Sequence, residues 1–588
     1  MINEISKIFN EQYKQIGEAL IIDNYTLAPG DYVMFTLKDT VDTIEILNVD
    51  KNTDREQDAY KKFAKLDSMS GLISMNKPID SDKIIHSNNM YTFYIKKDNL
   101  DTEKGKLNDR IIDAYYNILK NPEIKYKNKP KSKEIYLKAE EKHGKSDIEL
   151  IDKINIWIKE NIFKIAARVK LDKTYLKLFY DASSENYEKE SEKYILPNIY
   201  NSTDYNVKIN GKVYGLPDFN MGLNSKKPFL ENKTRKSKLP VLVDSDNIVI
   251  QKKLFDYLMN YSAQGKNYIY VGNEIEGMTP KEGREKDFEG YFLRVQKGKE
   301  VEIVDSDAIT SYRHELKKSI KLIRILDKGV GKDFLPLKKT FHNVYELKES
   351  IDEIFFNKYL NNNFFTEPKE IRLDNSKVKE ALIKYRYGFY TWFYKGNDSL
   401  VSKFWNKMTK ELLCSSMNYG NVNRAINQFN LRHALLDYFK NENGGEKMAN
   451  TVKDIRKDVD EKINMKEDPD YKMEVSSDKE YYFCIGQLLQ FFYAINKSGS
   501  KNYSFIRPIL SAKSDEFVKE QLKRLFTKYS YAIDKSFRFN NMYYMVAAHS
   551  PKGIVDQDML IAGFLCPNLI FKKSDKNNEE NREEMQHE

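Results

Sequence analysis

The sequence predicts an α+β protein, in which a mixed α/β N-terminal region is followed by an all-α C-terminal helical bundle. Three observations support this prediction. The chain has 588 residues, more than one ordinary hydrophobic core accommodates, so several domains are expected. Hydrophobic residues make up 40% of it, which is ample for folded cores. Alternating, strand-like patterns occur only before about residue 345, and helical stripes follow.

The first 100 residues are expected to combine an opening helix with strands. Apolar residues between Ile5 and Leu20 recur at helical spacing. Segments 32–39, 43–50 and 90–97 alternate apolar and polar side chains, as the strands of a hairpin or meander do.

The next stretch is expected to be helical over residues 105–180, apart from a polar, lysine-rich loop at 121–134. Residues 185–240 are expected to be irregular because Gly, Asn and Lys are frequent there. A helix should then begin near residue 251 and end at Gly265, since glycine commonly terminates helices.

Two further elements are predicted before residue 345. Residues 267–272 are expected to form a strand, and residues 290–305 a hairpin with its turn at 297–299. Residues 311–327 are expected to form a basic amphipathic helix. Its apolar face would consist of Leu316, Ile320, Ile323 and Leu326, and its basic face of Arg313, Lys317, Lys318, Lys321 and Arg324.

The C-terminal region carries four stripes with helical spacing. They are Val378, Leu382 and Tyr385; Val452, Ile455, Val459 and Ile463; Tyr482, Ile485, Leu489 and Phe492; and Val518, Leu522, Leu525 and Tyr529. We therefore expect a mixed α/β region at 1–345, a helical connecting region at 346–447, a helical bundle at 448–571 and a disordered tail at 572–588.

Charge and cysteine content narrow the class of protein. The net charge of +9 comes from 97 cations and 88 anions, so a nucleic-acid-binding surface would have to be a local patch. Cys414, Cys484 and Cys566 form no CxxC pair, so neither a disulfide framework nor a cysteine zinc site is expected. The sequence shows no signal peptide. Its apolar runs are all much shorter than the roughly 20 residues that span a bilayer, so we expect a cytoplasmic protein without membrane association.

Motifs for catalysis are incomplete. Residues 143–146, His-Gly-Lys-Ser, resemble the end of a phosphate-binding loop, but Ala139 occupies the position of the required glycine. His314-Glu315 begins like a zinc-protease helix and lacks the second histidine. Asp-Ser-Asp triplets fall where turns or strand ends are expected, at 80–82, 244–246 and 305–307. We expect no catalytic residue, no metal and no cofactor.

The most informative stretch is residues 214–240. Between Lys226 and Lys238 there are six cations and one anion, with interleaved asparagines that can bond phosphates or base edges. A solvated loop is the ordinary interpretation of such charge, and clustered Asn, Gly and aromatic residues favour nucleic acid. The predicted nucleic-acid-binding residues are Asn220, Asn224, Lys226, Lys227, Asn232, Lys233, Thr234, Arg235, Lys236 and Lys238. Within this set we expect Lys233, Arg235 and Lys236 to contact phosphates and Asn220 and Asn224 to contact base edges.

Several segments resemble one family. GLPDFNMGLNSKKPFLENKTRK (215–236) and QKKLFDYLMN (251–260), with DKEYYFCIGQLLQFF (478–492), RFNN (538–541) and DQDMLIAGFL (556–565), resemble the large subunits of type I-B CRISPR interference complexes (Cascade). Many members carry paired CxxC motifs before the first of these segments, and residues 198–215 here contain no cysteine, so no zinc is expected.

The resemblance implies a binding protein rather than an enzyme. It implies a subunit at the base of the complex that binds the CRISPR RNA-guided assembly and target double-stranded DNA. It also implies a part in reading the protospacer-adjacent motif, in forming the R-loop and in recruiting the helicase–nuclease. Other implied partners are the backbone and 5′-handle-binding subunits and a small subunit, and residues 1–345 would bind nucleic acid and the complex.

A second product could arise from the same gene. Gly-Gly-Glu-Lys before Met448, in an AT-rich genome, would often be encoded by GGA-GGA-GAA-AAA, a strong ribosome-binding sequence. Internal initiation would then yield a helical fragment similar to the family's small subunit. A glycine helix stop explains the protein sequence equally well.

Two other functions stay open. The chain could be a metal-dependent defence nuclease with an unrecognised site, or a scaffold that contacts only proteins. The basic face of the segment 311–327 is a weaker second candidate for nucleic-acid contact.

Overall fold

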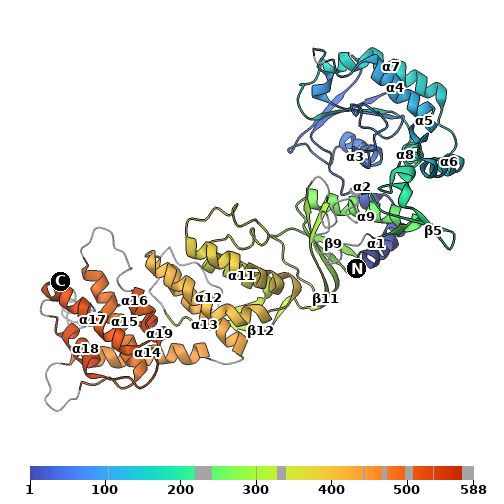
Figure 1. Ribbon diagram of the computed structural model, residues 1–588. Helices are drawn as coiled ribbons and strands as arrows, with labels where there is room; N and C mark the ends of the chain where they lie inside the picture. The colour runs from blue at the N-terminus through green and yellow to red at the C-terminus, as the bar shows by residue number, and fades with distance from the viewer. Residues whose placement is uncertain are drawn as a thin grey trace, which may run out of the picture. The chain divides into compact units, whose positions relative to one another are not determined.

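The computed structural model describes residues 1–103, 105–218, 241–298, 301–326, 340–440, 444–465, 473–496, 507–533 and 536–571 (Figure 1). The chain divides into two compact units. The first consists of Met1–Glu282 and Glu289–Thr310, and the second of Gly283–Phe288 and Ser311–Glu588. The domain limits expected at residues 345 and 447 stay predictions, and the predicted tail lies outside the described residues.

The predicted fold class is confirmed. The N-terminal part contains helices and sheets. After β13 (Thr340–Asn343) the described chain contains helices and no further strand (Figure 1). The change falls close to the residue at which alternating patterns end in the sequence.

The first unit begins with a four-stranded sheet in the order β2-β1-β4-β3. Its strands are β1 (Gly30–Phe35), β2 (Ile46–Val49), β3 (Thr92–Lys96) and β4 (Tyr175–Tyr180). β1 pairs antiparallel with β2 and parallel with β4, and β3 pairs antiparallel with β4. The predicted hairpin and the predicted strand at 90–97 are thus confirmed.

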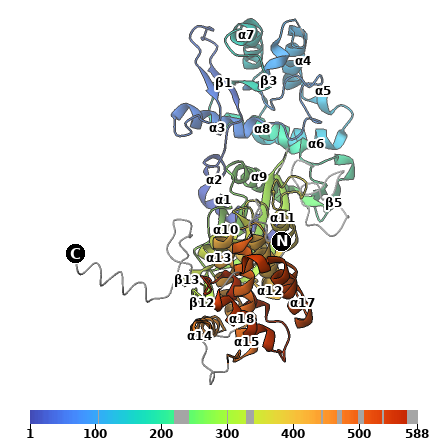
Figure 2. The ribbon, with the colours of Figure 1, turned by 90° about the vertical axis from the view of Figure 1, so that its left-hand side faces the viewer.

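Helices cover both faces of this sheet (Figure 2). Tyr32 packs against Phe63 on one face, and Phe35 stacks on Trp157 on the other with ring centroids 4.0 Å apart. Alternate strand residues point to opposite faces, which is why these two side chains, three residues apart, reach different helices. One layer contains α4 (Asp109–Lys120) and α7 (Ile148–Ala166), and the other α3 (Asp58–Ser70) and α8 (Ser184–Asn198).

Two sequence predictions for this region are wrong. Helix was expected over 105–180 apart from a loop at 121–134, yet β4 ends that range because Leu176 and Leu178 alternate with Lys177 at a period of two. Residues 185–240 were expected to be irregular, yet α8 occupies their beginning. Ser183 caps α8 by accepting a hydrogen bond from the amide of Asn186.

The first unit also contains a second four-stranded sheet, in the order β11-β10-β8-β9, with a helical cover, and a small three-stranded sheet described below. The helix predicted to run from residue 251 to Gly265 begins earlier, at Ser245, and ends at Ala263, two residues before Gly265, whose φ is +79°. Ile5 and Phe9 of α1 (Ile2–Ile16) share a buried core with Leu254 and Leu258 of α9 (Ser245–Ala263). The strands are β8 (Tyr268–Val271), β9 (Ile275–Met278), β10 (Phe288–Lys297) and β11 (Val301–Tyr312), while residues 299–300 of the predicted turn lie outside the described residues.

The prediction of a basic helix at 311–327 is also wrong, because the segment contains strands. β11 ends at Tyr312, and β12 (Glu315–Lys321) pairs antiparallel with β13. Leu316 and Ile320 are buried while Lys317 and Lys321 are exposed. A spacing of four residues fits both a helical face and one side of a strand, so this pair could not distinguish the two.

The second unit is otherwise a succession of helices. All four predicted stripes are buried in it, as expected. The helices are α10 (Val344–Phe356), α11 (Ser376–Lys395), α12 (Ser399–Asn418), α13 (Val422–Lys440), α14 (Gly444–Asn464), α15 (Asp478–Ile495), α16 (Arg507–Leu510), α17 (Asp515–Tyr529), α18 (Phe537–Ala548) and α19 (Gln557–Leu565).

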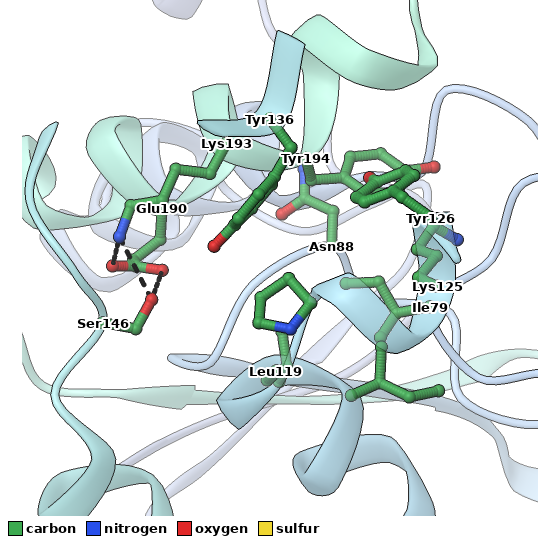
Figure 3. Close-up of a pocket in the computed structure, with 12 residues that line it drawn as sticks. Ile79, Asn88, Leu119, Lys125, Tyr126, Tyr136, Ser146, Glu190, Lys193 and Tyr194 are labelled. Carbon is green, nitrogen blue, oxygen red and sulfur yellow. Dashed lines mark hydrogen bonds and ion pairs between the residues drawn. The ribbon is translucent and has the colours of Figure 1, made fainter. Parts of the chain in front are cut away.

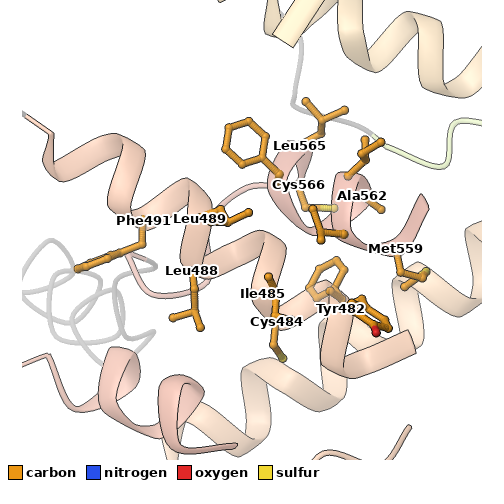
Figure 4. Close-up of a cluster of buried hydrophobic side chains, with 14 of the residues drawn as sticks. Tyr482, Cys484, Ile485, Leu488, Leu489, Phe491, Met559, Ala562, Leu565 and Cys566 are labelled. Atoms are coloured by element: carbon orange, nitrogen blue, oxygen red, sulfur yellow. The ribbon is translucent and has the colours of Figure 1, made fainter. Parts of the chain in front are cut away.

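The core of the C-terminal helices forms where α15 meets α19 (Figure 4). Tyr482 and Ile485 on α15 belong to the same apolar cluster as Met559 and Leu565 of α19. Two glycines, Gly486 and Gly563, lie where the two backbones approach most closely. Cys484 and Cys566 are unbonded and buried, so they pack as small apolar residues.

Candidate nucleic-acid interface

The ten residues predicted to bind nucleic acid lie outside the described residues. They are Asn220, Asn224, Lys226, Lys227, Asn232, Lys233, Thr234, Arg235, Lys236 and Lys238. The structure describes the two ends from which this segment emerges, which we call the root: residues 199–218 and 241–247.

The root is a small antiparallel sheet. β5 (Val207–Ile209), β6 (Lys212–Gly215) and β7 (Val243–Asp244) lie in that order. Tyr214 pairs with Asp244 and Gly215 with Val243, so the chain leaves and returns along two hydrogen-bonded neighbouring strands, about 5 Å apart. The predicted phosphate-binding segment therefore has both of its ends fixed at one place.

The β5–β6 hairpin closes through Asn210 and Gly211, whose φ values of 49° and 78° are both positive. Such a pair favours a two-residue type I′ turn, for which Asn-Gly is the preferred sequence. Gly215 has a different role. A Cβ there would lie 2.5 Å from the Tyr200 ring, so only glycine lets the backbone pass this side chain.

A buried ion pair anchors the outgoing end of the segment. The Asp218 carboxylate is 1% exposed and lies 2.8 Å from the Lys77 ammonium. The same ammonium donates to the carbonyls of Asn198, at 2.7 Å, and Tyr200. The amide of Asp218 donates to the Ile199 carbonyl at 2.9 Å. Burial lowers the pKa of Lys77, and the Asp218 carboxylate opposes that shift.

The returning end is fixed by a helix cap. Asp244 accepts hydrogen bonds from the amides of Asp246 and Asn247, each at 3.1 Å, and so begins α9. Lys212 pairs with Asp246 at 2.8 Å, and Lys208 lies 3.5 Å from a carboxylate oxygen of Glu134. These cations of the root are therefore locally balanced.

A lysine-rich segment, which the sequence analysis treated as a polar loop, lies beside the root. It comprises α5 (Glu123–Tyr126) and the start of α6 (Pro130–His143). Lys131 donates to the carbonyls of Asp204 and Asn206, both at 3.2 Å, and Ser132 shares a buried hydrogen bond with Thr203. More than 70 residues separate the partners, so sequence patterns gave no sign that they are neighbours.

A small pocket lies behind this segment (Figure 3). Tyr126, Tyr136 and Tyr194 line it, and at one end Glu190 binds Lys193 and Ser146, each at 2.7 Å. Its volume of about 40 Å³ holds a few water molecules but no nucleobase. The pocket is therefore not a base-binding site.

The second candidate for nucleic-acid contact was the basic face of residues 311–327. Nearby carboxylates neutralise part of its positive charge. Arg313 pairs with Asp287, and Lys317 lies 2.9 Å from Asp398. The hydrogen bond from Arg313 is the main cause that lowers the pKa of Asp287 to about 2. Arg313 lies between β11 and β12, and Lys317 lies in β12, so these paired cations do not form the continuous helical basic face that was predicted.

Described residues of the incomplete catalytic motifs form local hydrogen bonds and ion pairs. Asp80 accepts hydrogen bonds from the amides of Asp82, Ile84 and Ile85, and so shapes a turn. His143 is bonded to Glu192, and His314 to Asp287. Across the described ranges, no three His, Cys, Asp or Glu side chains gather as ligands for a metal ion. Nor does any described helix have the length and apolar character to cross a membrane.

Comparison with known proteins identifies no relative: the chain matches no family model, no curated protein and no solved structure.

Proposed function

We propose that this chain is the large, DNA-engaging subunit of a type I-B CRISPR interference complex, and that it binds nucleic acid without acting as an enzyme. The observation that carries the proposal is the segment 214–240, with its concentrated cations and its resemblance to that family. The geometry of the root supports it, because a phosphate-binding segment held at both ends can transmit its contacts to a folded unit.

Recognition would divide between two kinds of contact. Lys233, Arg235 and Lys236 would neutralise phosphates and supply most of the affinity, while Asn220 and Asn224 would contact base edges of the protospacer-adjacent motif. The sequence of the guide would be read by base pairing with the CRISPR RNA rather than by the protein. The proposed partners are the CRISPR RNA, target double-stranded DNA, the other Cascade subunits and the helicase–nuclease.

Removing the phosphate contacts tests the proposal. We expect the variant Lys233→Ala/Arg235→Ala/Lys236→Ala to bind target duplex about 100-fold more weakly at moderate salt, because three phosphate contacts are lost. The slope of log affinity against log salt should become shallower by about 2.7. Binding by the reconstituted complex would be measured across a salt series, on duplexes with and without the correct flanking motif.

A matched variant controls for overall charge. Lys7, Lys61 and Lys189 are exposed and paired with Glu4, Glu56 and Glu185, so replacing all three by alanine removes the same charge elsewhere. This control should bind normally. Equal losses in the two variants would indicate a nonspecific charge effect, and unchanged binding in both would reject the assigned phosphate contacts.

The alternatives make different predictions. A metal-dependent nuclease would cleave DNA when the purified chain receives Mg²⁺ or Mn²⁺, whereas the proposed subunit leaves the duplex intact. A scaffold that contacts only proteins would, as the purified chain, show no salt-dependent binding of any nucleic acid.

We also propose internal initiation at Met448. This residue lies in the first turns of α14 and is half-buried against the C-terminal core, so a fragment beginning there keeps nearly all of that helix. With a C-terminal tag, Met448→Leu should remove a short fragment on a blot while full-length protein persists. Met465→Leu, which lacks the upstream Gly-Gly-Glu-Lys, is the control and should leave the fragment unchanged. A fragment that survives Met448→Leu would reject internal initiation.

A further inference from the structure

The lysine-rich segment 125–133 is held rigidly against the root. Lys131 is bonded to two carbonyls of the root, and Ser132 is bonded to Thr203, as described above. Tyr126 is buried and accepts a hydrogen bond from the amide of the Asn198 side chain at 2.8 Å. The backbone that carries the lysines is thus fixed by buried contacts on both sides of residues 127–129.

The charges in this segment are not all balanced. Lys133 pairs with Glu123 at 2.9 Å. Lys127 and Lys129 are exposed, and within the described part of the chain neither has a carboxylate at ion-pair distance. This differs from the neighbouring surface of α6, where Lys138 pairs with Glu134 at 3.1 Å.

The positive charges of neighbouring lysines repel one another at this segment. Lys125 donates to the carbonyl of Pro78, and its pKa falls to about 7 because of burial and then of the charges on Lys129 and Lys77. Asp218, which is bonded to Lys77, is the carboxylate that offsets this group of cations. The amino end of α6 adds to the positive potential, because its first turn contains no acidic residue and no side chain caps it.

We infer that Lys127 and Lys129 form a second phosphate-binding surface, beside the root of the segment 219–240, that contacts the sugar–phosphate backbone of a nucleic acid. The inference rests on the proposed function and adds a site to it. The position supports it, since two basic segments far apart in sequence arise side by side in one unit. The small pocket behind the surface excludes base insertion, so the contact would be independent of sequence.

The test is the variant Lys127→Gln/Lys129→Gln in the reconstituted complex, with a random duplex and a single-stranded RNA as probes. Both side chains are exposed and unpaired in the described structure, so the fold should tolerate the change. We expect about tenfold weaker binding of the nucleic acid that this surface contacts, and a salt slope shallower by about 1.8 for duplex or 1.4 for single strands. A loss confined to duplex or to RNA would identify which backbone is bound.

The control Lys133→Gln/Lys138→Gln removes two paired cations from the same region and should bind normally. Unchanged affinity and slope for both probes in Lys127→Gln/Lys129→Gln would overturn the inference. If Lys233→Ala/Arg235→Ala/Lys236→Ala still loses binding of target duplex in that case, the proposed function stands; if the wild-type complex does not bind target duplex, the proposed function itself fails.

Proton uptake gives a second readout. Lys125 faces Lys77 with its partner Asp218, Lys129, and the ring of Tyr194 at 5.9 Å. A bound phosphate would raise the pKa of Lys125 from about 7, so binding should take up a proton near neutral pH and weaken as the pH rises further. Calorimetry in buffers of different ionisation enthalpy would detect this uptake.

Discussion

Replacing Gly486 or Gly563 by alanine is expected to destabilise the C-terminal helices by about 3 kcal/mol or more. A Cβ at Gly486 would lie closer than 3.0 Å to the carbonyl of Leu560 and the amide of Phe564, and one at Gly563 equally close to the carbonyl of Phe483. These are backbone atoms of a facing helix, so no side-chain rotation can relieve the clash. The helices α15 and α19 would have to separate, which opens the core that both of them share.

Chemical denaturation of the full chain, followed by circular dichroism, measures this effect as a lower midpoint. Gly553→Ala is the matched control in the same unit, because its Cβ would meet only Asp478, at an ordinary 3.5 Å. The control should change stability by less than about 1 kcal/mol. Midpoints that agree between Gly486→Ala and wild type would show that the two backbones are farther apart than described.

The helical region was predictable because its apolar residues repeat with a period that only a helix satisfies. Val452, Ile455, Val459 and Ile463 are spaced by three and four residues, which no strand places on one side, and all are buried. The predicted face of Leu316, Ile320, Ile323 and Leu326 also has spacings of three and four. Only Leu316 and Ile320 lie in β12, and Ile323 and Leu326 follow its end, so the prediction of a helix was wrong there. Periodicity thus fails when the residues that complete a helical stripe belong to different elements.

The site was predictable only as a local concentration of charge. The composition of residues 214–240 marked them as a candidate, but it could not indicate which residues lie next to them. The contacts of Lys77 with Asp218, and of Lys131 with Asp204, join residues separated by 73 positions or more, and such contacts depend on the fold of the whole unit. Gly486 and Gly563 lie in two of the segments that resemble the Cascade family. Their close approach could not be predicted, because it depends on how the two helices pack together.

The second large effect is expected at the root. Asp218→Ala should destabilise the root by about 3 kcal/mol, because it leaves the Lys77 ammonium largely buried without its partner. The carbonyls of Asn198 and Tyr200 would still accept hydrogen bonds from Lys77 but cannot neutralise its charge. Hydrogen exchange at the amides of β6 and β7 would accelerate accordingly, and binding of duplex by the complex would weaken because one end of the basic segment is no longer fixed.

Two variants separate this cause from a general loss of charge. Asp246→Ala, in the first turn of α9, breaks the pair with Lys212 of β6, but both partners are more than half exposed, so the cost should stay below about 1 kcal/mol. Lys77→Met/Asp218→Leu removes both buried charges together, and it should exchange more slowly than Asp218→Ala because no unpaired ammonium remains. If the double variant is instead as unstable as Asp218→Ala, the damage comes from lost packing, and the ion pair is not what holds the segment in place.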